Sequence, residues 1–348
     1  MIPSRPVGHT GLQLSTLGLG GTGLANMYAS VREDEAAKLI KGARSLGVSF
    51  FDTAPCYGVG LSEQRLGAIL PQLPRSSFVL STKVGYDLVA PDEGEDVEPS
   101  LFVECPRLTT RYDFSYDGAM RSIEGSLERL GIDRVDMVAI HDPDQTVGAD
   151  PTADPYSASL FAEAMAGAYR ALDDLRGQKV IRAVGVGMNQ WQMLVDFARE
   201  GDFDYFLCAG HYSLLQADAG EVLLPLCAEK GISVIVGGPY SSGILASGAV
   251  EGAMFNYAPA QPDILARVRA LEELCAAHGI SLRAAALQYP LLHPAVASVV
   301  PGARSLGELT QNAAALAEPV PEAFWRAATE RGLIAERHQP ANANDRIS

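Results

Sequence analysis

Four side chains that could move a proton lie at or just after the ends of three successive apolar runs. Asp52 ends one run and Tyr57 follows it five residues later, whereas Lys83 and His141 end the next two. Hydride transfer between a carbinol carbon and a nicotinamide ring requires a proton to move to or from the carbinol oxygen. A phenol with an ordinary pKa of about 10 is a poor base at neutral pH, so its pKa must be lowered. A buried ammonium would stabilise the phenolate, a carboxylate would keep that ammonium charged, and an imidazole would hydrogen-bond the substrate oxygen.

Each of these residues also has an ordinary structural explanation. An Asp at a strand end often caps the following turn, and a single histidine is more often a satisfied polar group than a catalyst. The combination is more informative, because the carboxyl ends of neighbouring parallel strands meet at one face of a barrel. We therefore treat Asp52, Tyr57, Lys83 and His141 as one candidate active site.

The chain around these residues alternates between short apolar runs and longer stretches of helical period, which is typical of repeated βα units. Strands are predicted at Thr16–Gly20, Val48–Asp52, Phe78–Lys83, Val135–His141, Ile181–Val186, Tyr205–Ala209, Ser233–Val236 and Ala297–Val300. Helices are predicted between them, for example at Asp34–Leu46, Gly118–Leu130, Phe161–Leu175 and Ile264–Ala277. This pattern predicts an α/β fold, a (β/α)8 TIM barrel that forms a single domain over residues 1–348.

Three stretches lie outside the repeat. Pro3–Leu14 is expected to form an N-terminal hairpin that closes the bottom of the barrel. Tyr86–Ser115 and Asp142–Ser157 are polar insertions, rich in Pro, Gly and Asp, after the third and fourth strands. Loops at the carboxyl ends of barrel strands form the active site, so these two are candidates for substrate walls or a lid.

The bulk composition favours an enzyme for small molecules. The 348 residues are 47% hydrophobic and carry a net charge of −15, which disfavours nucleic acid and membranes as partners because both attract basic surfaces. The five cysteines include no C-x-x-C pair, so neither a disulfide framework nor a metal site is expected, and a reducing cytoplasm is the simplest location. The N-terminal residues lack the pattern of an export signal. The sequence does not indicate an oligomeric state.

Gly18–Gly23 matches the G-x-G-x-x-G pattern of doubly wound dinucleotide-binding folds. That pattern must open a helix directly after its strand, whereas Leu24–Ser30 intervenes here before helical periodicity begins. The Y-x-x-x-K pair of short-chain dehydrogenases is absent as well. We therefore interpret these glycines as positions where the backbone approaches a ligand at the mouth of the first strand.

Several motifs resemble the aldo-keto reductase family across nearly the whole chain. They are Phe51–Gly58 with Ser62-Glu63 and Leu66-Gly67, then Ser81–Lys83 and Ile140–Asp142. The resemblance implies that Tyr57 is the acid/base, that Lys83 and Asp52 tune its pKa, and that His141 bonds the substrate oxygen.

The resemblance also implies a cofactor site. Asn189 matches the amide of the family's Ser-Asn pair, whereas Met188 departs from it. Gly237 stands where the family often stacks an aromatic residue on the nicotinamide; Tyr240 could replace that residue from a shifted position or simply anchor its loop. Gln311 and Asn312 would hold the adenine. The full expected set is Gly21, Thr22, Asp52, Asn189, Gly237, Gly238, Pro239, Ser241, Gly243, Gly302, Arg304, Glu308, Gln311 and Asn312.

The charges after the last strand favour NAD over NADP. NADPH-preferring members have basic residues at two positions that Gly302 and Glu308 occupy in this chain. A unit charge pair at about 4 Å is worth roughly 1 to 4 kcal/mol, depending on the dielectric. NAD is therefore expected to be preferred unless Arg304 binds the 2′-phosphate, and Glu308 could instead be a solvated charge on a helix face.

Within the family, further passages resemble the branch that includes aldose, L-galactose and pyridoxal dehydrogenases, which oxidise a cyclic hemiacetal to a lactone. These passages are Val184–Trp191, Tyr212–Leu215 and Val299–Ser305. The expected substrate is an aldose of the L-fucose, D-arabinose or L-galactose type, with pyridoxal as the alternative. A catalytically silent subunit that binds the cofactor as a sensor is the alternative of another class.

Substrate choice could differ from that of the sugar-oxidising relatives. They commonly have Arg at the position of His211 and frequently Asp at that of Gln216. The candidates for the pocket wall are Tyr28, Tyr86, Phe114, Trp191 and His211.

Overall fold

The computed structural model describes residues 2–93, 101–144 and 160–335. Its centre is a sheet of eight parallel strands in the order β14-β11-β10-β9-β8-β5-β4-β3. The strands are β3 (Leu19–Gly20), β4 (Phe50–Asp52), β5 (Val79–Val84), β8 (Met137–His141), β9 (Ala183–Met188), β10 (Tyr205–Ala209), β11 (Ser233–Gly237) and β14 (Val296–Val300). Hydrogen bonds from Gly18 N to Val299 O and from Val299 N to Thr16 O, both 2.9 Å, join the two outer strands. The predicted (β/α)8 barrel is thus confirmed, and each predicted strand overlaps an observed one.

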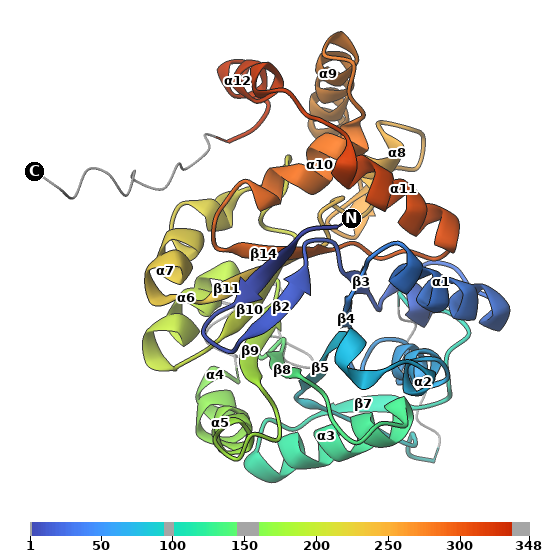
Figure 1. Ribbon diagram of the computed structural model, residues 1–348, viewed down its shortest axis with the longest axis vertical. Helices are drawn as coiled ribbons and strands as arrows, with labels where there is room; N and C mark the ends of the chain where they lie inside the picture. The colour runs from blue at the N-terminus through green and yellow to red at the C-terminus, as the bar shows by residue number, and fades with distance from the viewer. Residues whose placement is uncertain (1, 94–100, 145–159, 336–348) are drawn as a thin grey trace, which may run out of the picture.

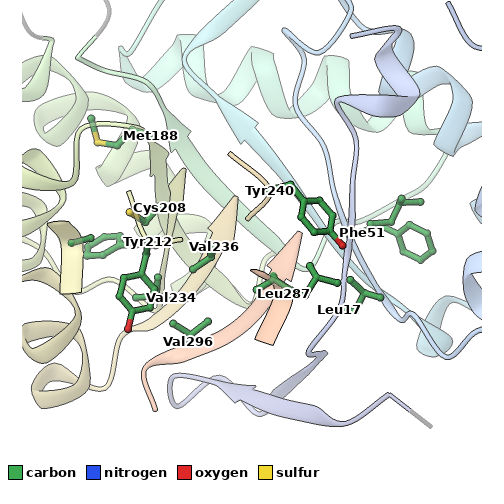
Figure 2. Packing of buried hydrophobic residues seen from close by; sticks show 14 of the residues in the cluster. Leu17, Phe51, Met188, Cys208, Tyr212, Val234, Val236, Tyr240, Leu287 and Val296 are labelled. Atoms are coloured by element: carbon green, nitrogen blue, oxygen red, sulfur yellow. The ribbon is translucent and has the colours of Figure 1, made fainter. Parts of the chain in front are cut away.

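Successive residues of each strand face opposite sides of the barrel wall. In β8, Met137 and Ala139 belong to a cluster inside the barrel, whereas Val138 and Ile140 belong to the cluster between the strands and the helices. Members of the outer cluster labelled in Figure 2 include Val234 and Val236 of β11, Val296 of β14 and Leu287 of α10. A polar residue with inward parity at the carboxyl end of a strand therefore points into the mouth of the barrel.

Helices connect the strands and surround the barrel (Figure 1). They are α1 (Glu33–Ser45), α2 (Leu61–Gly67), α3 (Tyr116–Leu130), α4 (Phe161–Ala164), α5 (Arg170–Gly177), α6 (Trp191–Glu200), α7 (Leu223–Lys230), α8 (Ile244–Ser247), α9 (Pro262–Ala277), α10 (Leu282–Leu291), α11 (Leu306–Ala317) and α12 (Glu322–Glu330). Among the described residues, no helix is long and apolar enough to cross a membrane.

The helix predicted at Phe161–Leu175 is divided by a π-helical turn at Met165–Tyr169. Within this turn Ala168 N donates to Phe114 O at 2.7 Å, and a Cβ on Gly167 would lie 2.4 Å from the same oxygen. The N–H of Ala168 therefore donates to a carbonyl outside the helix, and the helical period of the sequence does not reveal this change of acceptor.

An N-terminal hairpin of β1 (Ser4–Val7) and β2 (Leu12–Ser15) crosses the barrel, as predicted (Figure 1). Val7, Leu12 and Leu14 belong to the inner cluster. Their burial closes the amino-terminal end of the barrel with apolar side chains.

The loops at the carboxyl ends of the strands contain two further small hairpins. The insertion predicted at Tyr86–Ser115 contains β6 (Tyr86–Val89) paired with β7 (Thr109–Tyr112), and the segment after α8 contains β12 (Met254–Phe255) paired with β13 (Ala258–Pro259). The insertion predicted at Asp142–Ser157 lies outside the described residues after residue 144.

The loop after β3 pairs with the insertion after β5. Tyr28 N donates to Leu101 O at 2.8 Å, and Val103 N donates to Asn26 O at 3.1 Å. Two loops that are far apart in the sequence thus form one wall beside the mouth of the barrel.

Candidate active site

Asp52, Lys83 and His141 face the barrel interior at the carboxyl ends of three adjacent strands. His141 has the same parity along β8 as Met137, which lies in the inner cluster. Because side chains alternate along a strand, this parity directs the imidazole into the mouth of the barrel. Tyr57 follows β4 in the next loop, and the structure brings all four sequence-predicted groups together.

Lys83 and Asp52 form a buried ion pair at the centre of this group. The ammonium Nζ lies 2.7 Å from Asp52 Oδ2 and donates a second hydrogen bond to Thr53 O at 2.8 Å. Neither charged side chain is more than 3% exposed. Nζ also lies 4.6 Å from the centroid of the Tyr57 ring, a cation–π contact. Breaking a buried pair leaves an uncompensated charge and typically costs about 3 to 5 kcal/mol, so each partner holds the other in place.

Burial, followed by the negative charge of Asp52, raises the pKa of the Tyr57 phenol well above its ordinary value. From the residue types alone a lowered pKa is expected, because a free ammonium beside a phenol stabilises the phenolate. In the structure Lys83 is paired with Asp52 at 2.7 Å, so little net positive charge is left to offset the burial of the phenol. In the protein alone, Tyr57 is therefore the protonated acid.

His141 is held between two polar side chains. Its Nδ1 lies 3.4 Å from Cys56 Sγ, and its Nε2 lies 3.5 Å from Asp142 Oδ2. The ring packs edge-on against Tyr57, with centroids 5.6 Å apart. Burial, followed by the charge of Lys83, lowers the pKa of His141 well below its usual range. The imidazole is therefore neutral, with one N–H that it can donate to an oxygen.

A cavity of about 740 Å³ opens beside Asp52 and Tyr57 and extends to the first turns of α11. Asp52 Oδ1 is buried and has no hydrogen-bond partner among the described residues. This oxygen is an acceptor available to a ligand hydroxyl, such as that of a ribose. The walls include the glycines Gly20, Gly21, Gly23, Gly210, Gly237, Gly238, Gly243, Gly252 and Gly302. A cavity of this volume, with nine glycines in its walls and a buried acceptor beside it, fits a nicotinamide dinucleotide.

The residues predicted to bind the cofactor line this cavity, with one exception. The lining contains Gly21, Thr22, Asp52, Gly237, Gly238, Pro239, Ser241, Gly243, Gly302, Arg304, Glu308, Gln311 and Asn312. Asn189 lies beside the wall, where its Nδ2 donates to Ala209 O at 3.3 Å. Met188, which departs from the family pattern, points outward into the cluster under the helices (Figure 2), so its side chain does not affect the cavity.

Tyr240 anchors the loop after β11. Its hydroxyl donates to Asn312 Oδ1 at 2.8 Å, and Arg283 Nη1 donates to the same oxygen at 3.1 Å. Of the two alternatives for Tyr240, the structure therefore shows the loop anchor at the α11 end of the cavity. Gly237, Leu207 and Ala209 also line the cavity, and they contribute small or aliphatic surface to it.

Arg304 and Glu308 form a mutual cap at the start of α11. Glu308 Oε2 accepts a hydrogen bond from Arg304 N at 2.9 Å, and Oε1 accepts one from Arg304 Nη2 at 3.2 Å. Ser305 Oγ accepts from Glu308 N at 3.2 Å, an arrangement close to a capping box. Both charged side chains also line the cavity, so the carboxylate has a structural role and a partly compensated charge.

Two of the five candidates for the substrate wall lie at the cavity or beside the imidazole of His141. Tyr28 lines the mouth of the cavity and is 45% exposed. Tyr86 packs edge-on against His141, with ring centroids 5.4 Å apart. Either side chain can therefore reach a molecule held beside the imidazole or at the cavity mouth.

The other three candidates, like Tyr86, are not among the residues that line the cavity. Phe114 is fully buried in the core, where a Cβ on Gly85 would meet its ring, so it has no surface to offer a ligand. Trp191 begins α6 and packs against the outer cluster. His211 is bonded through Nδ1 to Gln216 Nε2 at 2.9 Å.

The structure adds residues that the sequence analysis did not single out. The ring of Phe102 lies 6.2 Å from that of Tyr57, and Tyr257 lines the cavity together with Tyr28. Both lie in loops, where no periodicity marks them. Cys56 and Asp142, the two neighbours of the imidazole, were signalled only by their position next to Tyr57 and His141 in the sequence.

The glycines of the segment Gly18–Gly23 serve the packing of the barrel as well as the cavity. A Cβ on Gly23 would lie 2.3 Å from Ala303 O, and one on Gly21 would lie 2.8 Å from Asp52 O. The missing side chains therefore let the loop after β3 approach the backbone of its neighbours, and the expectation of an approach to a ligand alone was incomplete.

All five cysteines are free, and the described ranges contain no group of three or more His, Cys, Asp or Glu placed to hold a metal ion.

Comparisons with known proteins agree with this geometry. Residues 16–331 match the family described as "Aldo/keto reductase family". The chain is 36% identical to a pyridoxal 4-dehydrogenase of Microbacterium luteolum, over 95% of this chain and 97% of the relative. It is 35% identical to a D-threo-aldose 1-dehydrogenase of a Pseudomonas species, over 93% and 96%. The fold is similar to that of an aldo-keto reductase from Bacillus halodurans, with a TM-score of 0.70 and 25% identity over 97% of this chain and 99% of the other.

Proposed function

We propose, from the premise that the chain belongs to the aldo/keto reductase family, that it oxidises the anomeric hydroxyl of an aldose hemiacetal to a lactone, with NAD as the oxidant. The coarser statement follows from the family: the chain is an oxidoreductase that acts on small molecules with a nicotinamide cofactor. The arrangement of Tyr57 against the Lys83–Asp52 pair and a neutral His141, at one end of the cavity, is the observation that carries the proposal.

Each side chain has a defined task in this reaction. His141 donates its ring N–H to the anomeric oxygen, and Tyr57 takes the proton from that oxygen as the carbon is oxidised. Bound NAD supplies the hydride acceptor and a positively charged nicotinamide ring. Lys83, kept charged and in place by Asp52, stabilises the phenolate that accepts the proton. Because the pKa of Tyr57 is raised in the protein alone, oxidative turnover should increase toward alkaline pH.

The names of the relatives support the oxidative direction of the reaction and the class of substrate. The two most similar proteins described above are both named dehydrogenases, one of an aldose and one of pyridoxal. Pyridoxal also forms a cyclic hemiacetal, so it is the second candidate substrate. The identity of 36% to a pyridoxal 4-dehydrogenase supports this second candidate.

The preference for NAD is supported by Glu308, which places a carboxylate where the cavity reaches α11. Asp52 Oδ1 would accept from a ribose hydroxyl at the opposite end, and Gln311 and Asn312 would hold the adenine.

The proposal is tested by mixing the protein with NAD and, separately, L-fucose, D-arabinose, L-galactose and pyridoxal. We expect NADH to form with at least one sugar and the matching lactone to appear by mass spectrometry. If pyridoxal were the only compound of the four to be oxidised, the proposed sugar substrate would be wrong and pyridoxal, the second candidate, would take its place. Tight binding of NAD without turnover of any substrate would contradict the proposal and favour a cofactor-binding sensor.

A further inference from the structure

We propose that Asp142 is a specificity-determining residue whose carboxyl binds the hydroxyl next to the reacting carbon, so that the site selects aldoses that carry a 2-hydroxyl. This inference rests on the proposed function, because it takes the anomeric carbon as the reacting centre. It concerns a residue outside the group of four that moves the proton and the hydride.

The carboxyl lies beside the atom that must hold the substrate oxygen. Asp142 Oδ2 is 3.5 Å from His141 Nε2, and the side chain is 17% exposed. An oxygen that accepts a hydrogen bond from Nε2 therefore lies within reach of a second oxygen that is bonded to Oδ2.

The backbone holds Asp142 in this place at a cost. Its φ of 46° is in the left-handed region, and its N–H donates to Gly187 O at 3.0 Å. Asp and Asn are among the few residues that adopt this region, and strained backbone of this kind clusters at ligand sites. The hydrogen bond to β9 thus fixes a conformation that turns the carboxyl back toward His141.

The carboxyl also faces the space between the aromatic side chains of the site. Its negative charge contributes to raising the pKa of three phenols, those of Tyr57, Tyr86 and Tyr112. Tyr57 and Tyr86 both pack against the His141 ring. A substrate oxygen that is bonded to His141 Nε2 therefore lies close to Asp142 Oδ2 as well.

The chemistry of an aldose identifies the group that this carboxyl can bind. Besides its own hydroxyl, the anomeric carbon is bonded to the ring oxygen and to C2. The ring oxygen only accepts hydrogen bonds, whereas C2 carries the 2-hydroxyl, which also donates. A carboxylate accepts hydrogen bonds and does not donate them, so it pairs with the 2-hydroxyl. In the pyridoxal hemiacetal the corresponding carbon is part of the aromatic ring and bears no hydroxyl, so this contact favours sugars.

The protonation of Asp142 sets the pH range in which this contact selects the 2-hydroxyl. Burial, followed by the charge of Asp144, raises the pKa of Asp142 to about 8, while the charge of Lys83 opposes the shift. The titratable groups that face it are Cys56, Tyr57, Lys83, Tyr86, Tyr112, His141 and Asp144. Above about pH 8 the group is a carboxylate, which pairs with the 2-hydroxyl and not with the ring oxygen, whereas the carboxylic acid present at lower pH can donate to either oxygen.

The test uses two sugars that differ in a single group, D-arabinose and 2-deoxy-D-ribose, which lacks only the 2-hydroxyl of the former. Initial rates with NAD give kcat/KM for both sugars in the wild type, in Asp142→Asn and in Asp144→Asn. Asn tolerates a left-handed φ, so Asp142→Asn changes the charge and not the backbone. Asp144→Asn is the matched control, because it removes a neighbouring carboxylate that does not contact the imidazole. Thermal unfolding and NAD binding of each variant are measured alongside.

At about pH 9, where Asp142 is ionised, we expect D-arabinose to be favoured about 10- to 100-fold in the wild type and in Asp144→Asn, the range for a hydrogen bond to a charged group. In Asp142→Asn this ratio should fall at least fivefold, with NAD binding unchanged. Equal losses of kcat/KM for both sugars in Asp142→Asn would overturn the inference and leave the proposed function intact. Turnover of neither sugar by the wild type would overturn both.

Discussion

Replacing Glu308 with Gln removes one negative charge from the cavity wall at α11 and tests the proposed preference for NAD. The carboxylate is tied to Arg304 at 3.2 Å, and the two side chains are 36% and 50% exposed. A charge this exposed acts through a dielectric close to that of water, so its repulsion of a 2′-phosphate is worth about 1 kcal/mol at about 4 Å. Gln keeps an oxygen that can accept from Arg304 N, so the cap of α11 should survive.

The assay compares kcat/KM for NAD and for NADP with one sugar. We expect the wild type to favour NAD, and the ratio to narrow about fivefold in Glu308→Gln, mainly through better use of NADP. In Glu308→Gln, Arg304 has lost its partner and becomes available to the 2′-phosphate. Adding Arg304→Gln to that variant should therefore widen the ratio of kcat/KM for NAD to that for NADP again. Glu330→Gln is the control, because Glu330 is an exposed carboxylate at the end of α12 that does not line the cavity. A wild type that prefers NADP, or a ratio unmoved by Glu308→Gln, would refute the charge argument.

Three further predictions follow from contacts around the site. Cys56→Val removes the partner of His141 Nδ1 and should lower kcat about fivefold, whereas Cys56→Ser keeps a hydrogen-bonding group and should lose less; equal losses would refute the role of this contact. The pKa of Asp142 is about 8 in the folded protein against an ordinary value of 3.8, so the folded state holds more protons between these values and loses stability as pH rises through them. Asp142→Asn should therefore raise Tm more at about pH 8 than at about pH 5, and a gain independent of pH would contradict this sign. Gly23→Ala places a Cβ 2.3 Å from a facing carbonyl and should lower Tm by several degrees, whereas Gly177→Ala meets nothing within 4 Å and should not; similar Tm values for both variants would refute the packing argument.

The barrel and the placement of the four central groups were predictable because both follow from local pattern. Strand residues alternate in and out, so an Asp, a Lys and a His that stand at inward-facing positions at the ends of adjacent strands converge on the barrel mouth. The same alternation explains Met188, which has outward parity on its strand, so its side chain leaves the cavity unchanged.

The loops were less predictable, because their contacts depend on chain segments far apart in the sequence. Phe102 reaches Tyr57 through the pairing of residues 26–28 with residues 101–103, and neither segment has a periodic pattern. Phe114 was expected on the pocket wall because it belongs to an insertion, yet it is buried in the core. The raised pKa of Tyr57 was missed for a different reason: the charge of Asp52 offsets that of Lys83, and residue types alone do not show how two charges cancel.

The most direct test of the central claim is the rate of NADH formation by Tyr57→Phe with a sugar that the wild type oxidises. Phe keeps the ring that contacts Lys83 and His141 and removes only the hydroxyl. We predict that turnover falls at least about a thousandfold, near the middle of the range for loss of a general acid/base, while the dissociation constant of NAD stays nearly unchanged. Retained turnover, with NAD binding intact, would contradict the assignment of Tyr57 as the group that takes the proton.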